Sequence, residues 1–113
     1  MKHIKAIIRP EMLDVVLAAL KQIGAYRGIT VSEVMGHGNQ KGVEQSWRGE
    51  KYHLDLLQKA MLDMIVNDEE VENIKKTIID SVRTGEKGDG KIFIYDVQEA
   101  IRIRTGEEGD DSL

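Results

Sequence analysis

The order of apolar and polar residues predicts a strand, a helix and a second strand in the first third of the chain. Residues 4–8 alternate apolar and polar side chains, as a strand with one buried face does. Residues 13–20 repeat apolar side chains at helical spacing after Pro10, which suits the first turn of a helix. Gly24 is expected to end this helix, and residues 29–35 alternate again in a β-rich segment.

The same succession of patterns returns further along the chain. Residues 60–66 alternate, and Asn67 with Glu70 resembles a capping box at the start of a helix. Apolar residues at helical spacing over 71–82 predict that helix, and residues 92–97 predict the strand that follows it.

The C-terminal residues complete the predicted topology. Residues 101–104 predict a short last strand, and residues 110–112 predict a frayed tail. The main elements follow the order βαββαβ, with a long loop over residues 36–53 between the second and third strands. This order is typical of the split βαβ, ferredoxin-like arrangement, an α+β fold.

Two helices in this arrangement cover one face of the sheet, and the other face needs a different cover. The first and third strands turn a half-apolar set of side chains to that open face: Lys5, Ile7, Lys59, Met61, Asp63 and Ile65. Apolar surface of this extent is unusual on a monomer. We therefore expect a homo-oligomer that packs these faces together.

Composition narrows the class of protein further. The 113 residues form one domain, 1–113, with 41% hydrophobic residues and no cysteine, which excludes disulfides and thiol chemistry. No apolar run approaches the roughly 20 residues that span a bilayer, and Met1–His3 leads straight into a strand without a signal peptide. We expect a cytoplasmic protein. The net charge of −4, with no single basic stripe, argues against nucleic acid as a partner.

The segment 84–91 carries the clearest candidate chemistry. Its glycines and its closing lysine are Gly85, Gly88, Gly90 and Lys91. Glycines at this density let backbone N–H groups approach an anion. Arg102 and Arg104 share one face of the expected last strand, so the two segments of one chain are expected to form a polyphosphate cradle. The alternatives are a plain Asp89-Gly90 hairpin turn and a solvated pair of arginines.

The long loop, residues 36–53, is the second candidate. It holds four glycines among polar side chains and shows no sustained period. Loops longer than about 12–15 residues in a compact domain are usually functional or disordered. Trp47 and Arg48 are of the residue types most common at interface hot spots, so this loop is predicted to contact a partner protein.

Four ordered motifs resemble the P-II nitrogen-regulatory signal proteins over nearly the whole chain. They are Gly38-x-Gln40-Lys41-Gly42, Arg48-Gly49-x-x-Tyr52, Thr84-x-x-x-Gly88-Asp89-Gly90-Lys91-Ile92-Phe93 and Ile101-Arg102-Ile103-Arg104-Thr105-Gly106. The resemblance implies a homotrimer of ferredoxin-like subunits. It implies competitive binding of ATP or ADP in clefts between subunits, and of 2-oxoglutarate beside Mg-ATP. It also implies that the long loop, called the T-loop, docks on targets such as ammonium transporters or nitrogen-assimilation enzymes. Docking on a transporter would recruit the protein to the membrane.

The resemblance assigns a role to each matching position. The phosphate-binding residues would be Gly88, Asp89, Gly90 and Lys91, joined by Arg102 and Arg104 of a neighbouring subunit. The adenosine pocket would be lined by Ile7, Thr30, Gly36, His37, Gly38, Asp63 and Ile65. The 2-oxoglutarate site would use Gln40, Lys41 and Lys59, with Gln40 also a magnesium ligand.

The chemistry of these groups agrees with that assignment. Mg²⁺ takes six oxygens in near-octahedral order and usually receives several from phosphates. A 2-oxo acid offers the metal two more oxygens, one from its keto group and one from a carboxylate, and Gln40 could supply another oxygen. Lys59 could pair with the far carboxylate of the acid. The metabolite would therefore bind only after ATP has placed the metal. The effector would act through its differential affinity for two T-loop states.

Several positions depart from the family pattern. Asn39 stands where many relatives carry an arginine, Asp63 replaces a glutamate, and Trp47 replaces a tyrosine. Glu50 occupies the place of a serine that some relatives phosphorylate. Tyr52 matches a tyrosine that is nucleotidylated in some lineages, and a plain loop tyrosine is the alternative.

Two other function classes remain open from the sequence. The first is a small nucleotide hydrolase, although no base–nucleophile pair is evident and at most slow ATP turnover is expected. The second is a trimeric metal-tolerance binding module of similar fold. His3, His37 and His53 lack metal-ligand spacing, so no metal is assigned to them.

Overall fold

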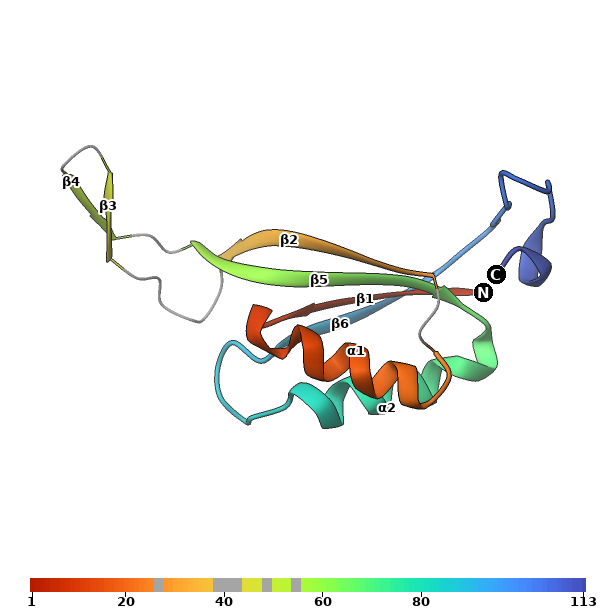
Figure 1. Cartoon of the computed structure of the whole chain (residues 1–113), viewed down its shortest axis with the longest axis horizontal. Coiled ribbons are helices and arrows are strands. Elements are labelled where there is room, and N and C mark those ends of the chain that lie inside the picture. The colour runs from red at the N-terminus through yellow and green to blue at the C-terminus, as the bar shows by residue number, and fades with distance from the viewer. Residues whose placement is uncertain (26–27, 38–43, 48–49, 54–55) are drawn as a thin grey trace.

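A computed structural model describes residues 1–25, 28–37, 44–47, 50–53 and 56–113, the backbone alone for 44–47 and 50–53. Figure 1 shows two helices lying side by side against one face of a long sheet. The fold is the α+β, ferredoxin-like arrangement that the order of elements predicts.

The first half of the chain forms β1 (Lys2–Ile8), the 3-10 turn η1 (Pro10–Met12), α1 (Leu13–Gln22) and β2 (Ile29–His37). Pro10 lies in the first turn, where its missing N–H costs no hydrogen bond. The chain leaves α1 at Gly24, which has φ +79°, as the sequence predicts.

The second half forms β5 (Leu56–Val66), the turn η2 (Asp68–Glu70), α2 (Val71–Val82) and β6 (Gly90–Asp96). The predicted capping box at Asn67 is wrong. The Asn67 amide donates to Glu70 Oε1 at 3.3 Å, and no side-chain oxygen caps the helix. Asn67 Oδ1 is buried without a hydrogen-bond partner in the part of the chain that the structure describes. The intervening 3-10 turn moves the helix start beyond its reach.

The four main strands lie in the order β2-β5-β1-β6, and every neighbouring pair is antiparallel. β1 therefore lies between β5 and β6 at the centre of the sheet. Its partners follow from the register: Lys5 lies opposite Asp63 on β5 and opposite Phe93 on β6. Directly opposed residues share a face, so the register also assigns each side chain to a face of the sheet.

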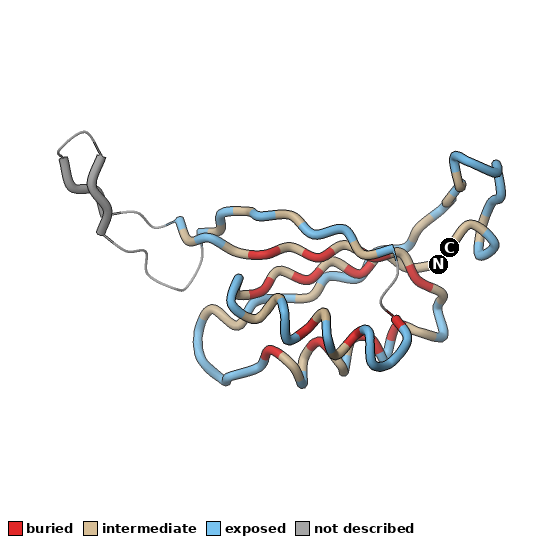
Figure 2. Tube along the Cα trace, viewed as in Figure 1, coloured by how far each residue is buried: buried red, intermediate tan, exposed pale blue. Residues whose placement is uncertain are grey.

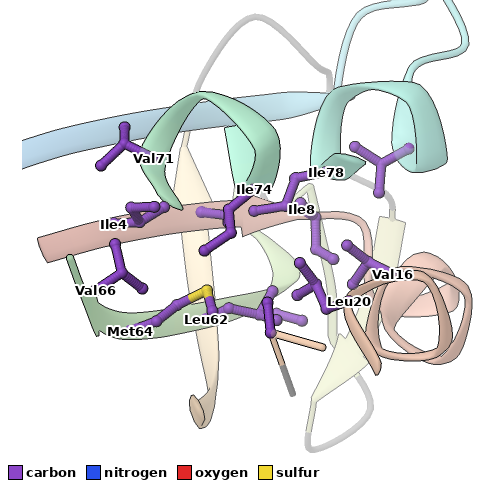
Figure 3. Close-up of a cluster of buried hydrophobic side chains, with 14 residues drawn as sticks. Ile4, Ile8, Val16, Leu20, Leu62, Met64, Val66, Val71, Ile74 and Ile78 are labelled. Carbon is purple, nitrogen blue, oxygen red and sulfur yellow. The ribbon is translucent and has the colours of Figure 1, made fainter. Parts of the chain in front are cut away.

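The core lies between the sheet and the two helices. Figure 2 shows buried positions alternating along the central strands and facing the sheet from both helices. The largest fully buried side chains belong to one core cluster, and Figure 3 labels all of them: Ile4, Ile8, Val16, Leu20, Leu62, Met64, Ile74 and Ile78. Full burial of each such side chain contributes about 1.5–3 kcal/mol, so this layer holds the helices on the sheet.

The opposite face of the sheet carries partly exposed side chains, as predicted. All of Lys5, Ile7, Lys59, Met61, Asp63 and Ile65 are half-buried, and Phe93 and Tyr95 extend the apolar part of this face. Among the described residues, neither helix is long enough or apolar enough to cross a membrane.

Two predictions for the C-terminal residues are wrong. Residues 101–104 form no strand: Ile101 makes an isolated bridge to Glu108, and the residues between them turn back. The expected frayed tail is ordered instead, because residues 109–112 form the 3-10 turn η3 (Gly109–Ser112).

The segment between the second and third main strands also differs from the expected unpatterned loop. β2 and β5 extend further than their apolar alternation indicates, to His37 and from Leu56. Within the segment, β3 (Glu44–Trp47) and β4 (Glu50–His53) pair as a separate two-stranded antiparallel sheet. The residues of both strands are mostly polar, so the sequence gives no period-2 hydrophobic signal there.

Candidate functional site

A cavity of about 540 Å³ lies at one end of the open sheet face, beside the glycine-rich loop. Small-molecule sites usually measure about 300–1,000 Å³. The residues around the cavity are Ile7, Gly36, His37, Leu57, Lys59, Glu86, Lys87, Gly88, Asp89, Gly90, Lys91 and Phe93. The structure thus brings most of the predicted phosphate and nucleoside residues together with Lys59.

Strand register explains why these residues meet. Gly90 pairs with Ile8 where β6 begins, which places the loop over the end of β1. A Cβ on Gly90 would lie 1.8 Å from the carbonyl oxygen of Ile7, and the residue has φ +109°. Only glycine fits this approach of the loop to the strand.

Asp89 organises the loop from within. Its carboxylate accepts hydrogen bonds from the Thr84 hydroxyl, and at 2.8 Å each from the backbone N–H groups of Thr84 and Gly85. Those donors, the Thr84 hydroxyl foremost, hold the pKa of the Asp89 carboxyl below its ordinary value. The predicted phosphate-binding role of Asp89 therefore concerns its backbone, since its side chain is occupied in shaping the loop.

Two cations hold the loop from outside. Arg9 donates to the carbonyl oxygens of Lys87 and Gly88, the latter at 3.2 Å, and its guanidinium lies 3.6 Å from Asp89. Lys59 also donates to the Gly88 carbonyl at 3.2 Å. Of the two, Lys59 lines the cavity, so an anion that enters the cavity would meet its ammonium group.

The remaining polar groups give the cavity a cationic rim. Lys59, Lys87 and Lys91 line it, against Glu86 and an Asp89 already satisfied by amides. Within the described residues no three His, Asp or Glu side chains gather as a metal site would require. The arrangement suits a multiply charged anion with an apolar group beside it.

Three predicted nucleoside residues lie on the same face but do not line this cavity. Thr30 pairs with Asp63 across β2 and β5, and Ile65 lies two residues further on. The Asp63 carboxylate lies 2.7 Å from His3 Nε2. His3 in turn lies 5.3 Å from the Tyr95 ring. His3, for which the sequence predicted no role in the site, thus lies between Asp63 of β5 and Tyr95 of β6.

Arg102 and Arg104 lie at the opposite end of β6 from the loop, in the blue C-terminal segment of Figure 1. The predicted cradle from two segments of one chain is therefore wrong. β6 is seven residues long, about 23 Å at 3.3 Å per residue. No arginine side chain bridges that distance, so these arginines could reach such a cavity only on another copy.

Several predicted residues fall outside the described part of the chain: Gly38, Gln40, Lys41 and Arg48. For Trp47 and Tyr52 the structure describes the backbone, in β3 and β4, and not the side chains. Their roles stay predictions.

Sequence reasoning missed Arg9, Leu57 and Phe93. Strand alternation offered a signal for Leu57 and Phe93. Leu57 precedes Lys59 by two residues, and Phe93 follows Lys91 by two, so each shares a face with a residue that was chosen. Arg9 follows the end of β1, where alternation gives no such signal.

A second cavity, of about 490 Å³, lies between α2 and β6 on the far side of the same loop. Its walls are mainly aliphatic, including Ile78, Val82 and Ile92. Lys75, Arg83 and Lys91 also line this second cavity, but Gly36 and Gly88 do not. The cavity on the open face is the better candidate site because it joins the glycine-rich backbone of Gly88 and Gly90 to Gly36 and Lys59.

The fold and the cavity define a ferredoxin-like α+β protein with a glycine-rich loop beside a cationic site. The family model "Nitrogen regulatory protein P-II" matches residues 1–107. The chain is 52% identical to Nitrogen regulatory protein P-II 2 of Methanothermobacter thermautotrophicus over 96% of this chain and 94% of that protein. It is 47% identical to Nitrogen regulatory protein P-II of Pasteurella multocida over the whole of both chains. It is 48% identical to that of Rhodospirillum rubrum, again over both full lengths. The chain belongs to the nitrogen regulatory protein P-II family, which confirms the resemblance drawn from its motifs.

Proposed function

We propose that this protein senses cellular energy and carbon status by binding ATP or ADP and, with Mg-ATP, 2-oxoglutarate. It passes that state to a target protein through residues 36–53, the T-loop. One observation carries the proposal: the cavity on the open sheet face joins the predicted phosphate loop, Gly88–Lys91, to Ile7, Gly36 and Lys59. Membership of a nitrogen regulatory family supports the signalling role.

The residues at the cavity fit a nucleotide. Lys87 and Lys91 suit phosphate oxygens, and the positive φ of Gly88 and Gly90 brings backbone close to the cavity. Ile7 and Phe93 supply apolar surface for a base or ribose. Arg102 and Arg104 of a second copy would complete the phosphate site, and a homotrimer would supply that copy to each site.

Lys59 would give up its hydrogen bond to the Gly88 carbonyl and pair with a carboxylate of 2-oxoglutarate. Gln40 and the nucleotide phosphates would hold Mg²⁺, which supplies the site with a chelating centre for the keto acid. Lys41 would exchange between the ligands and Asp63. The base of the T-loop would then differ between the ADP state and the Mg-ATP–2-oxoglutarate state.

The output would be protein binding in the cytoplasm. Trp47 and Arg48 would contact an ammonium transporter or a nitrogen-assimilation enzyme, and a transporter would recruit the chain to the membrane. The family relatives carry the names of regulatory proteins and not of enzymes. Any ATP turnover would be far below about 1 s⁻¹, against a typical enzyme rate near 10 s⁻¹.

Calorimetric titration tests the proposal. ATP and ADP should each bind, and 2-oxoglutarate should bind only after Mg-ATP. Gln40→Ala should abolish 2-oxoglutarate binding and leave ATP binding intact, while Gln45→Ala, in the same segment, should leave both intact. No binding of either nucleotide would refute the proposal. Normal 2-oxoglutarate binding by Gln40→Ala would refute the metal-bridged site alone.

A further inference from the structure

The side chain of Arg102 is already engaged by its own C-terminal segment. Its Nη1 donates to Glu107 Oε1 at 3.1 Å. Its Nη2 donates to the backbone carbonyls of Ser112 at 3.3 Å and Leu113 at 3.2 Å. The backbone reinforces this fold, because the Arg102 N–H donates to the Glu107 carbonyl at 2.8 Å. The guanidinium thus ties residues 107–113 to the chain that precedes them.

Arg104 differs from Arg102 although it is only two residues away. It is exposed, and no hydrogen bond or ion pair holds its side chain among the residues that the structure describes. Arg104 can therefore bind an anion without giving up a contact. Arg102 is already paired with the Glu107 carboxylate.

We propose that Glu107, with the chain that follows it, competes with the nucleotide phosphate for Arg102. The inference rests on the proposed nucleotide site. A phosphate reaching Arg102 must displace or neutralise the Glu107 carboxylate, so Glu107 lowers nucleotide affinity.

The strength of the contact suits an exchangeable competitor. The Arg102 and Glu107 side chains are 34% and 46% exposed, so water screens the pair and its energy is modest. A nucleotide di- or triphosphate carries more charge and more acceptors than one carboxylate, and arginine favours such forked contacts. The pair therefore orders the tail in the absence of nucleotide and yields when nucleotide arrives.

The test compares Glu107→Gln with Glu108→Gln by calorimetric titration of the full chain with ADP and with ATP. Both variants remove one negative charge from neighbouring positions, but only Glu107 bonds Arg102. Loss of an exposed competing pair should tighten nucleotide binding by about two- to five-fold in Glu107→Gln. Glu108→Gln should bind as wild type. In an Arg102→Ala background, Glu107→Gln should bring no gain.

Hydrogen exchange at the amides of Gly106 and Gly109, measured without nucleotide, gives a second readout. Glu107→Gln should expose both amides to faster exchange, because the guanidinium then holds the tail less firmly. Faster exchange with unchanged nucleotide affinity would overturn the inference, because the contact would be structural only. Equal affinity gains in both charge variants, or a gain that persists without Arg102, would also overturn it. Failure of wild type and every variant to bind nucleotide would instead refute the proposed function, and the inference with it.

Discussion

At the scale of single residues, Asp89 shows how a residue inside a ligand loop can serve the loop more than the ligand. Its carboxylate accepts hydrogen bonds from two backbone N–H groups and one hydroxyl of the same loop. Because these contacts favour the ionised form, the folded pKa of Asp89 is lower than the unfolded one. Its contribution to loop order is complete above the ordinary aspartate value of about 3.9 and is lost as the pH falls through the lower folded value.

We predict that the amide resonances of Thr84 and Gly85 titrate in wild-type protein with a midpoint below that of an ordinary aspartate. Asp89→Asn should remove the titration and shift both amides at neutral pH. Glu86→Gln is the matched control: it removes a charge in the same loop without touching these bonds. A midpoint at the ordinary value, or a titration that survives Asp89→Asn, would contradict the assignment.

Gly90 gives a second prediction at this scale. Gly90→Ala forces a Cβ into the Ile7 carbonyl and retains a positive φ, whereas Gly85→Ala has a positive φ with open space around it. Strain and overpacking each cost about 1–3 kcal/mol, so Gly90→Ala should lose clearly more stability than Gly85→Ala. Urea unfolding at equal protein concentration measures the difference. Equal losses would show that the loop does not press on β1.

At the scale of elements, hydrophobic periodicity predicted the strands that are buried on one face. It failed for residues 101–104, where strand formation depends on a neighbouring strand to pair with. Alternation found β1 because Ile4, Ala6 and Ile8 are all buried against the helices. Ile101 and Ile103 alternate with arginines just as well, yet Ile103 is 99% exposed. Among the described residues, Ile101 makes one isolated bridge, to Glu108, and no strand pairs with this segment. A local pattern shows that a segment suits a strand and not whether a neighbouring strand is there to bond it.

The candidate site, too, was predicted only in part from the sequence. Glycine spacing and lysines pointed to residues 84–91, because backbone access and charge are properties of residue type. Arg9 was missed because its role depends on carbonyls 78 and 79 residues away. The folded register creates that contact, and no spacing along the chain signals it.

The T-loop segment carries the prediction at the element scale. Arg48→Ala should leave ATP, ADP and 2-oxoglutarate binding unchanged and lose the protein partner, since a buried hot-spot residue typically contributes 2 kcal/mol or more, about thirty-fold in affinity. Binding to a cognate ammonium transporter is measured with ADP and again with Mg-ATP and 2-oxoglutarate. Lys51→Ala, which removes a charge from the same segment, is the control. If Arg48→Ala still bound the transporter normally in the presence of ADP, Arg48 would not make the contact.

At the scale of the whole molecule, one chain looks like part of a larger assembly. The open sheet face is half-apolar, and Phe93, Tyr95, Ile101 and Ile103 are all exposed large hydrophobic residues. Arg104 lies beyond the far end of β6 from the cavity that it is proposed to serve. Both features agree with a ring of copies in which each C-terminal segment reaches the next copy's cavity. Sedimentation should accordingly give three chains of 12.7 kDa, about 38 kDa in all, and a stable monomer would contradict it.

Complementation between subunits tests that geometry directly. Arg104→Ala removes a proposed phosphate contact from one side of the cleft, and Lys91→Ala removes one from the other. Charged hydrogen bonds contribute roughly 1.5–3 kcal/mol, so each variant alone should lose about ten-fold or more in affinity for ATP and ADP. When the two variants are unfolded and refolded together, some clefts receive Lys91 from one chain and Arg104 from the other. Those clefts should bind nucleotide with wild-type affinity.

Refolding either variant with itself is the control, and native mass spectrometry verifies mixed trimers. Mixed trimers without recovered tight sites would mean that Arg104 and Lys91 do not share a cleft across subunits.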